Sequence, residues 1–188
     1  MTVRGDGSLA KNGGKDGLDP QDRIFLVDVS DEEEGGGGRT LSFSRSPTVL
    51  LTFVANRFSR ISTRQYIERF GIGVMDWRML VMLTREPGAT VTRASNVIGI
   101  DKAAVSRCLQ RLDQMGLAHP GELEPNGRSR RWRLSLRGRE LHDQVLRRAL
   151  QFQRQLLSGF TDEEIKQLLD MLRRMLTNIA KTDDVENC

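Results

Sequence analysis

Residues 90–139 read TVTRASNVIGIDKAAVSRCLQRLDQMGLAHPGELEPNGRSRRWRLSLRGR, and this stretch decides the fold. Its first half has the pattern of a helix-turn-helix, with a short helix over 91–98, a turn at Gly99 and a second helix that begins beside Asp101. Asp101 is a suitable N-cap because its carboxylate can accept a hydrogen bond from a free amide of the first turn. Residues at spacings of three and four form the inner face of the second helix: Val105, Cys108, Leu109 and Leu112.

The outer face of the second helix carries short, polar or cationic side chains, namely Lys102, Ala103, Ser106, Arg107 and Gln110. A helix with an apolar inner face and such an outer face can enter the major groove of DNA. Arg111 lies further round the helix, where we expect it to meet the DNA backbone or solvent.

The second half of the stretch predicts a two-stranded ribbon. A strand over 117–123 leads to a turn at 125–127, which contains the pair Asn126-Gly127, and a second strand returns over 132–136. Asn-Gly favours a hairpin because both residues tolerate positive φ. Residues 128–139 contain six arginines and no acid. Such a ribbon can reach phosphates or a minor groove, although an isolated charge run is often only a solvated surface. Its place after a helix of suitable polarity predicts a winged helix.

Length and charge favour one domain with a polyanionic partner. The chain has 188 residues and a net charge of +4, but residues 1–46 hold nine acids and six bases, so the remainder is more basic than the average. Cys108 and Cys188 have neither metal-ligand nor disulfide-framework spacing, which predicts no metal and a reducing compartment. Without an apolar run of membrane-spanning length or a signal peptide, we expect a cytoplasmic protein.

The regions outside the central stretch divide into tails and long helices. Residues 1–46 contain nine of the 18 glycines and predict a flexible, acidic tail, in which Ile24 to Val27 form either a short strand that docks or an apolar patch in a flexible arm. Apolar periodicity predicts helices over 47–70, 75–85 and 136–157, followed by a last helix that begins with a capping box of Thr161 and Glu164. Residues 181–188 predict a polar, frayed tail.

The long terminal helices carry apolar stripes that need a partner. Packing within one subunit is one reading, but groove-reading modules usually act as two-fold dimers. We therefore predict a mainly α fold with a small β-hairpin wing, in which residues 47–180 form one domain with a DNA-binding core at 75–136 and dimerisation helices at 47–70 and 137–180. The predicted dimer contacts are Leu50, Phe53, Phe58, Ile165, Leu168, Leu172, Met175, Leu176 and Ile179.

Over about 47–179 these residues resemble the MarR family of bacterial winged-helix regulators. The resemblance rests on FGIGVMDWRML (residues 70–80), IDKAAVSRCLQRLDQMGLAHP (100–120) and PNGRSRRWRLSLRGR (125–139), in that order. Two departures stand out. The family wing usually has Asp two residues before its key arginine, where this chain has Asn126 and Arg128, and the family often has Thr as a helix cap where this chain has Gly73.

The resemblance implies a homodimer on a palindromic operator, acting as a repressor that a ligand releases. It places Lys102, Ala103, Ser106 and Arg107 against bases and nearby phosphates, and Arg128 in a minor groove, with Arg130 or Arg131 sharing its role. It also implies that Thr90, Thr92 and Arg93 hold phosphates at a helix N-terminus. A small aromatic or phenolic effector is expected near Arg57, Met75, Trp77 and Met79, although such residues are more often core. Oxidant-sensing relatives use a cysteine near the start of the first long helix, and residues 47–70 contain none.

Two other classes of function remain as alternatives. An enzyme is disfavoured because His119 and His142, which we expect at exposed or partly packed positions, accompany no nucleophile motif, phosphate loop or metal-ligand cluster, so we expect no cofactor. A winged helix that binds protein, or that binds nucleic acid without sequence preference as an architectural protein, is the second alternative, and the arginine-rich wing argues against pure protein binding.

Overall fold

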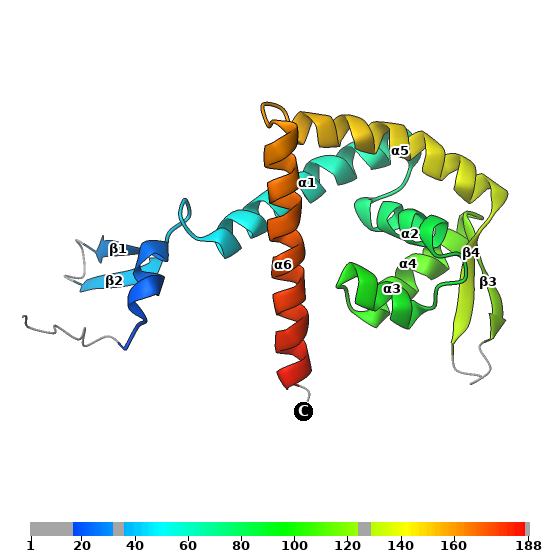
Figure 1. Ribbon diagram of the computed structural model, residues 1–188. Helices are drawn as coiled ribbons and strands as arrows, with labels where there is room; N and C mark the ends of the chain where they lie inside the picture. The colour runs from blue at the N-terminus through cyan, green and yellow to red at the C-terminus, as the bar shows by residue number, and fades with distance from the viewer. Residues whose placement is uncertain (1–16, 32–35, 124–128, 187–188) are drawn as a thin grey trace, which may run out of the picture. The chain divides into compact units, whose positions relative to one another are not determined.

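The computed structural model describes residues 17–31, 36–123 and 129–186 (Figure 1). Their elements are the 3-10 helix η1 (Pro20–Phe25), strands β1 (Leu26–Asp31) and β2 (Gly36–Leu41), helices α1 (Pro47–Phe70), α2 (Val74–Arg85), α3 (Val91–Ile98) and α4 (Lys102–Gln114), strands β3 (Ala118–Leu123) and β4 (Arg130–Leu134), and helices α5 (Leu136–Leu156) and α6 (Asp162–Glu186). The chain divides into two compact units, residues 1–60 and 61–188. Among the described residues, no helix combines the length and the apolar character needed to cross a membrane.

The first unit contains an antiparallel pair of β1 and β2, which runs from Leu26 and Leu41 to Asp31 and Gly36. The Arg39 guanidinium and the Asp28 carboxylate form an ion pair of 2.9 Å across the two strands. The expected flexible tail over 1–46 is therefore wrong for the described residues of this region. Composition suggested that so little apolar surface cannot offset the ordering entropy, but paired strands also satisfy backbone hydrogen bonds.

The short strand expected over Ile24 to Val27 is present in part, and docking of this segment stays a prediction. Leu26 and Val27 lie in β1, whereas Ile24 and Phe25 belong to η1, which begins at an Asp19 cap that accepts a hydrogen bond from the Gln21 amide. The Phe43 ring also contacts the Phe53 ring of α1 edge to face, with centroids 5.3 Å apart.

The second unit is built around α2, which contacts α3, α4, α5 and β4. Its fully buried side chains lie on α1, α2, α4 and α5 and in the segments before α2 and β3. They include Tyr66, Ile72, Met79, Leu80, Leu83, Val105, Leu109, Leu112, Leu117 and Val145. The structure is thus mainly helical with one small hairpin in this unit, as the sequence predicts for a winged helix-turn-helix.

Helices α3 to α6 each begin at a side-chain cap, and the caps at Asp101 and Thr161 are among them, as the sequence predicts. Thr90 accepts a hydrogen bond from the Arg93 amide, Asp101 from Ala104 and Ser135 from Gly138, while Thr161 and Glu164 form a reciprocal capping box. Gly99 ends α3 in the left-handed region, with φ of 72°. These local signals fix where α3, α4, α5 and α6 begin.

Gly138 allows α5 to start directly against the ribbon. A Cβ atom at this position would lie 1.9 Å from the backbone oxygen of Leu117. Leu117 also receives a backbone hydrogen bond from Ser135, so the end of β4, the turn before β3 and the first turn of α5 are held together. Any side chain at position 138 would force these segments apart.

An aromatic cluster joins α1, α2 and α5 within the second unit. The Tyr66 ring contacts those of Phe70, Trp77 and Phe152, and the His142 ring stacks on Trp77 with centroids 5.3 Å apart. His142 is only 8% exposed, which corrects the expectation of an exposed or partly packed side chain. A histidine on an amphipathic helix can replace an apolar residue when an aromatic ring covers it.

The two long C-terminal helices, α5 and α6, end at Leu156 and Glu186, and Leu156 is 50% exposed. The polar tail was expected from Lys181, but α6 continues to Glu186. Polar residues at a helix end can stay helical because each added residue closes one more backbone hydrogen bond.

Candidate nucleic-acid interface

Helix α4 lies with its apolar face on the core and its polar face toward solvent. Val105, Cys108, Leu109 and Leu112 are all buried, as their spacing predicts. Lys102, Ala103, Arg107 and Gln110 are exposed, and Ser106 is half-buried. The predicted face for base contacts is thus available on one side of a well-packed helix.

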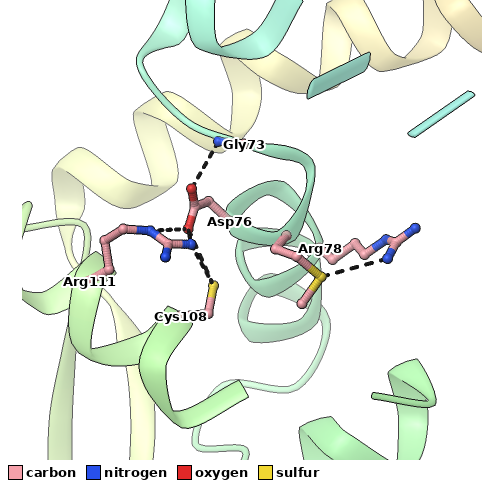
Figure 2. A network of polar contacts seen from close by, with 6 residues as sticks. Gly73, Asp76, Arg78, Cys108 and Arg111 are labelled. Atoms are coloured by element: carbon pink, nitrogen blue, oxygen red, sulfur yellow. Dashed lines mark hydrogen bonds and ion pairs between the residues drawn. The ribbon is translucent and has the colours of Figure 1, made fainter. Parts of the chain in front are cut away.

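The Asp76 carboxylate fastens α4 to α2 (Figure 2). It is only 4% exposed, and it accepts hydrogen bonds from the Gly73 amide at 2.9 Å, the Arg111 Nε at 3.0 Å and the Cys108 thiol at 3.3 Å. The Arg111 Nη2 also donates to Oδ1 of Asp76, the oxygen that accepts from the Arg111 Nε and the Cys108 thiol. Arg111 therefore contacts a buried acid while about half of its side chain stays in solvent, as expected, and its contact with the DNA backbone stays a prediction.

The same network suppresses the reactivity of Cys108. Burial, followed by the nearby negative charge of Asp76 and its hydrogen bond, raises the pKa of the thiol to about 12. Since the thiolate is the reactive form, Cys108 is a core residue rather than a nucleophile at neutral pH. This agrees with the core interpretation from its position on the helix.

The N-terminus of α3 displays Thr92 and Arg93 to solvent and Thr90 at its half-buried cap. Arg93 is not free, because its Nε and Nη2 donate to the two carboxylate oxygens of Glu86 at 2.8 and 2.9 Å. Hydrogen bonding from Arg93 holds the pKa of Glu86 below its ordinary value. Sequence reasoning missed this pair because a Pro-Gly turn separates the two residues and gives no helical spacing.

The ribbon of β3 and β4 is anchored by Trp132. Its indole is buried, its backbone amide donates to the Ala89 oxygen at 3.0 Å, and its own oxygen accepts from the Gly88 amide at 2.8 Å. The returning strand begins at Arg130 and ends at Leu134, earlier at both ends than predicted, because Ser135 already caps α5. Trp132 thus binds the wing to the loop before α3.

The cationic side chains of the wing are exposed where the structure describes them. Arg130, Arg131 and Arg133 all reach solvent on β4. Asn126 and Arg128 lie outside the described residues, so the role predicted for Arg128 stays a prediction.

The four residues predicted for an effector pocket differ in their surroundings. Met79 is fully buried, Trp77 is part of the aromatic cluster, and the Met75 sulfur accepts a hydrogen bond from Arg78 at 3.6 Å (Figure 2). Arg57 belongs to the first unit, where it lines a groove of about 350 Å³ with Phe53, Asn56 and Arg60. Their role as a pocket stays a prediction.

The predicted dimer contacts include large apolar side chains that the single chain leaves exposed. Leu50, Phe53, Met175, Leu176 and Ile179 are exposed, and Phe58, Ile165, Leu168 and Leu172 are half-buried. Among groups of acidic, histidine and cysteine residues in the described part of the chain, none is arranged to hold a metal ion.

Comparison with known proteins identifies the fold. A model of the MarR family matches residues 70–131, which contain α2, α3, α4 and most of the wing. The structure also resembles a MarR/EmrR family transcriptional regulator from Acinetobacter sp. ADP1, with a TM-score of 0.70 and 27% identity over 75% of this chain and 99% of that one. The chain is therefore similar to the MarR family in sequence over residues 70–131, and its fold is that of a MarR family regulator. The family resemblance and the winged-helix fold predicted from sequence are thereby confirmed.

The fold is also similar to that of a regulator from Listeria monocytogenes whose structure was solved in complex with a 26mer DNA. It has a TM-score of 0.69 and 22% identity over 73% of this chain and 91% of that one. The uncharacterized helix-turn-helix-type transcriptional regulator YdgJ of Bacillus subtilis (strain 168) is 28% identical over 109 residues, which cover 58% of this chain and 66% of YdgJ. About a third of YdgJ thus lies outside the match.

Proposed function

We propose that this protein is a sequence-specific regulator of transcription that binds double-stranded DNA as a homodimer on a palindromic operator. The observation that carries the proposal is the exposed outer face of α4, with Lys102, Ala103 and Arg107 in solvent, on a helix whose opposite face is fully packed. A rigid helix of this polarity beside a basic wing has the geometry that reads a major groove.

The proposed division of labour follows the elements. Ser106 and Arg107 contact base edges, and Arg107 can make a bidentate contact with guanine. Two groups of residues contact phosphates and so set the register of the protein on the duplex. They are Thr90, Thr92 and Arg93 at the start of α3, and Arg130 and Arg131 on the wing. Arg128 reaches the minor groove in this proposal.

Dimerisation places two such modules on one operator. The apolar side chains at the start of α1 and along α6 are the surfaces that a second copy covers in this proposal, since contiguous exposed apolar residues on a regulator mark an interface. Half-sites one helical turn apart would match two recognition helices related by a two-fold axis.

We further propose that the protein is a repressor released by a small aromatic or phenolic effector near Arg57, Met75, Trp77 and Met79. It acts in the cytoplasm, together with the DNA it controls, and the proposal includes neither catalysis nor a cofactor. The named relatives are regulators rather than enzymes, which supports this choice.

The test is binding to the DNA that flanks the coding region of the protein, compared with scrambled DNA of the same length at two salt concentrations. A regulator of its own region binds the flanking DNA about a thousandfold more tightly, and the preference survives at the higher salt. Equal, salt-sensitive binding to both calls for a genome-wide selection of sites. If that selection also finds no preferred sequence, the architectural alternative replaces the proposal.

A further inference from the structure

Arg93 and Glu86 form a two-pronged ion pair at the junction between α2 and α3. The two contacts of 2.8 and 2.9 Å join parallel donors of the guanidinium to both oxygens of one carboxylate. This is the geometry in which arginine binds a carboxylate or a phosphate most strongly. The side chains are 56% and 31% exposed, so the pair stands at the surface and a ligand can reach it.

Both partners are held in place through their backbones. The Glu86 amide donates to the Met82 oxygen at 2.8 Å, and the Glu86 oxygen accepts from the Ala89 amide at 3.1 Å. The Arg93 amide donates to the hydroxyl of the Thr90 cap at 3.2 Å. The backbones of both residues are therefore fixed, so the pair can open by rotation of the two side chains alone.

The position of Glu86 conflicts with the proposed role of this helix end. The first turn of a helix attracts phosphate, and Arg93 is the cation that accompanies Thr90 and Thr92 there. A phosphate that approaches Arg93 finds the Nε and Nη2 fork already occupied, and it meets a carboxylate of its own charge. Binding a phosphate through this fork thus requires an exchange of one anion for another.

We propose that Glu86 is an internal competitor of DNA, whose carboxylate occupies the phosphate-binding donors of Arg93 in the free protein. Its function is to lower the affinity for DNA, since a phosphate that binds the Nε and Nη2 fork of Arg93 must first displace the carboxylate. The inference rests on the proposed DNA-binding function and adds a residue that limits it.

The experiment is a double-mutant cycle on the full-length protein with the selected operator, or with random duplex DNA if no operator is found. The variants are Glu86→Gln, Arg93→Gln and the double substitution. Glu86→Gln should tighten binding about threefold to fivefold, the range expected for release of an exposed ion pair. In the Arg93→Gln background the same substitution should change affinity no more than the control does.

The matched control is Glu122→Gln, which removes a negative charge from an exposed position on β3 that has no ion-pair partner among the described residues. A gain from Glu86→Gln that equals the control, or that persists unchanged without Arg93, would show a general charge effect and overturn the inference.

The salt dependence gives an independent measurement. If Arg93 releases Glu86 and binds a phosphate in the complex, Arg93→Gln should reduce the magnitude of the slope of log affinity against log salt. The expected reduction is about 0.9, the value for one lost phosphate contact. An unchanged slope means that Arg93 touches no phosphate, and the inference falls. If the wild-type protein binds no DNA at all, the proposed DNA-binding function is wrong. This result differs from a negative double-mutant cycle or an unchanged salt slope, which overturn only the role of Glu86.

Discussion

The carboxylate of Asp76 in α2 and the guanidinium of Arg111 in α4 form an ion pair at the edge of the core. Asp76 is 4% exposed, whereas the Arg111 side chain is 49% exposed, so a buried acid is neutralised by a cation that reaches in from the surface. The pair joins α4 to α2, the central helix of the unit, and its two residues are 35 positions apart in the sequence. The orientation of α4 therefore depends on one polar network as well as on apolar packing.

Replacing Asp76 with asparagine should destabilise the protein by about 1–3 kcal/mol, because Arg111 loses its counter-charge and the Gly73 amide loses a charged acceptor. Urea unfolding followed by circular dichroism measures this as a lower midpoint with an unchanged slope. Asp113→Asn is the control, since Asp113 is an exposed acid on α4, the helix that carries Arg111. Equal midpoints for the two variants would mean that the buried pair adds nothing to stability.

Gly138→Ala should be more damaging than its size suggests. The added Cβ would lie 1.9 Å from the Leu117 oxygen, so α5 must move off the ribbon, at a cost of about 3 kcal/mol or more. Thermal unfolding should show a clearly lower melting temperature.

Gly73→Ser is the comparison for that substitution. Gly73 caps α2 with φ of −90°, and a Cβ there meets nothing closer than 3.7 Å. A serine cap should raise stability by a few tenths of a kcal/mol. If Gly138→Ala were as well tolerated as Gly73→Ser, the close contact at Leu117 would be incorrect.

The thiol of Cys108 should be unreactive in the folded protein. With a pKa of about 12, only about one thiol in ten thousand is ionised at pH 8, whereas an unfolded cysteine has a pKa near 8.5. In the Cys188→Ser variant, alkylation by iodoacetamide at pH 8 should be slow until urea unfolds the chain. Fast alkylation of the folded variant would reopen the possibility of a thiol switch.

The same pKa difference predicts how stability changes with pH. The folded thiol keeps its proton up to about pH 12, but the unfolded thiol loses it above about pH 8.5, so the unfolded state gains stability as the pH rises between these values. The free energy of unfolding of the wild type should therefore fall more steeply above pH 9 than that of Cys108→Ala, measured by urea unfolding. Parallel curves would contradict the raised pKa.

The positions of these groups explain what the sequence could predict. Spacing and caps are local, so the bounds of α3 and α4 and the inner face with Cys108 follow from neighbours in the chain. Arg111 and Arg93 were expected in solvent or on DNA because nothing local indicates that tertiary packing brings Asp76 and Glu86 to them. His142 was misplaced for the same reason, since its covering ring, Trp77, comes from another helix.

The base-reading role of α4 can be tested with Arg107→Ala. If Arg107 contacts a guanine, the variant should lose about tenfold to a hundredfold in affinity for the operator and much less for random DNA. Fluorescence anisotropy with both DNAs measures the two losses. Gln114→Ala is the control at an exposed position at the end of α4, outside the predicted DNA-contacting face, where no comparable loss is expected. Equal losses on both DNAs would assign Arg107 to the DNA backbone.

The dimer surface can be tested with a charge at Leu176. This side chain on α6 is 68% exposed in the single chain, so Leu176→Asp leaves the monomer fold intact but places an unpaired carboxylate in an interface that uses this face. Sedimentation velocity should find a dimer for the wild type and a monomer for the variant at micromolar concentration, with unchanged helical content. Arg174→Asp is the control, since it introduces the same charge at an exposed and already polar position of the same helix. A variant at Leu176 that remains as dimeric as this control would exclude the exposed face of α6 from the interface and leave the start of α1 as the surface to test.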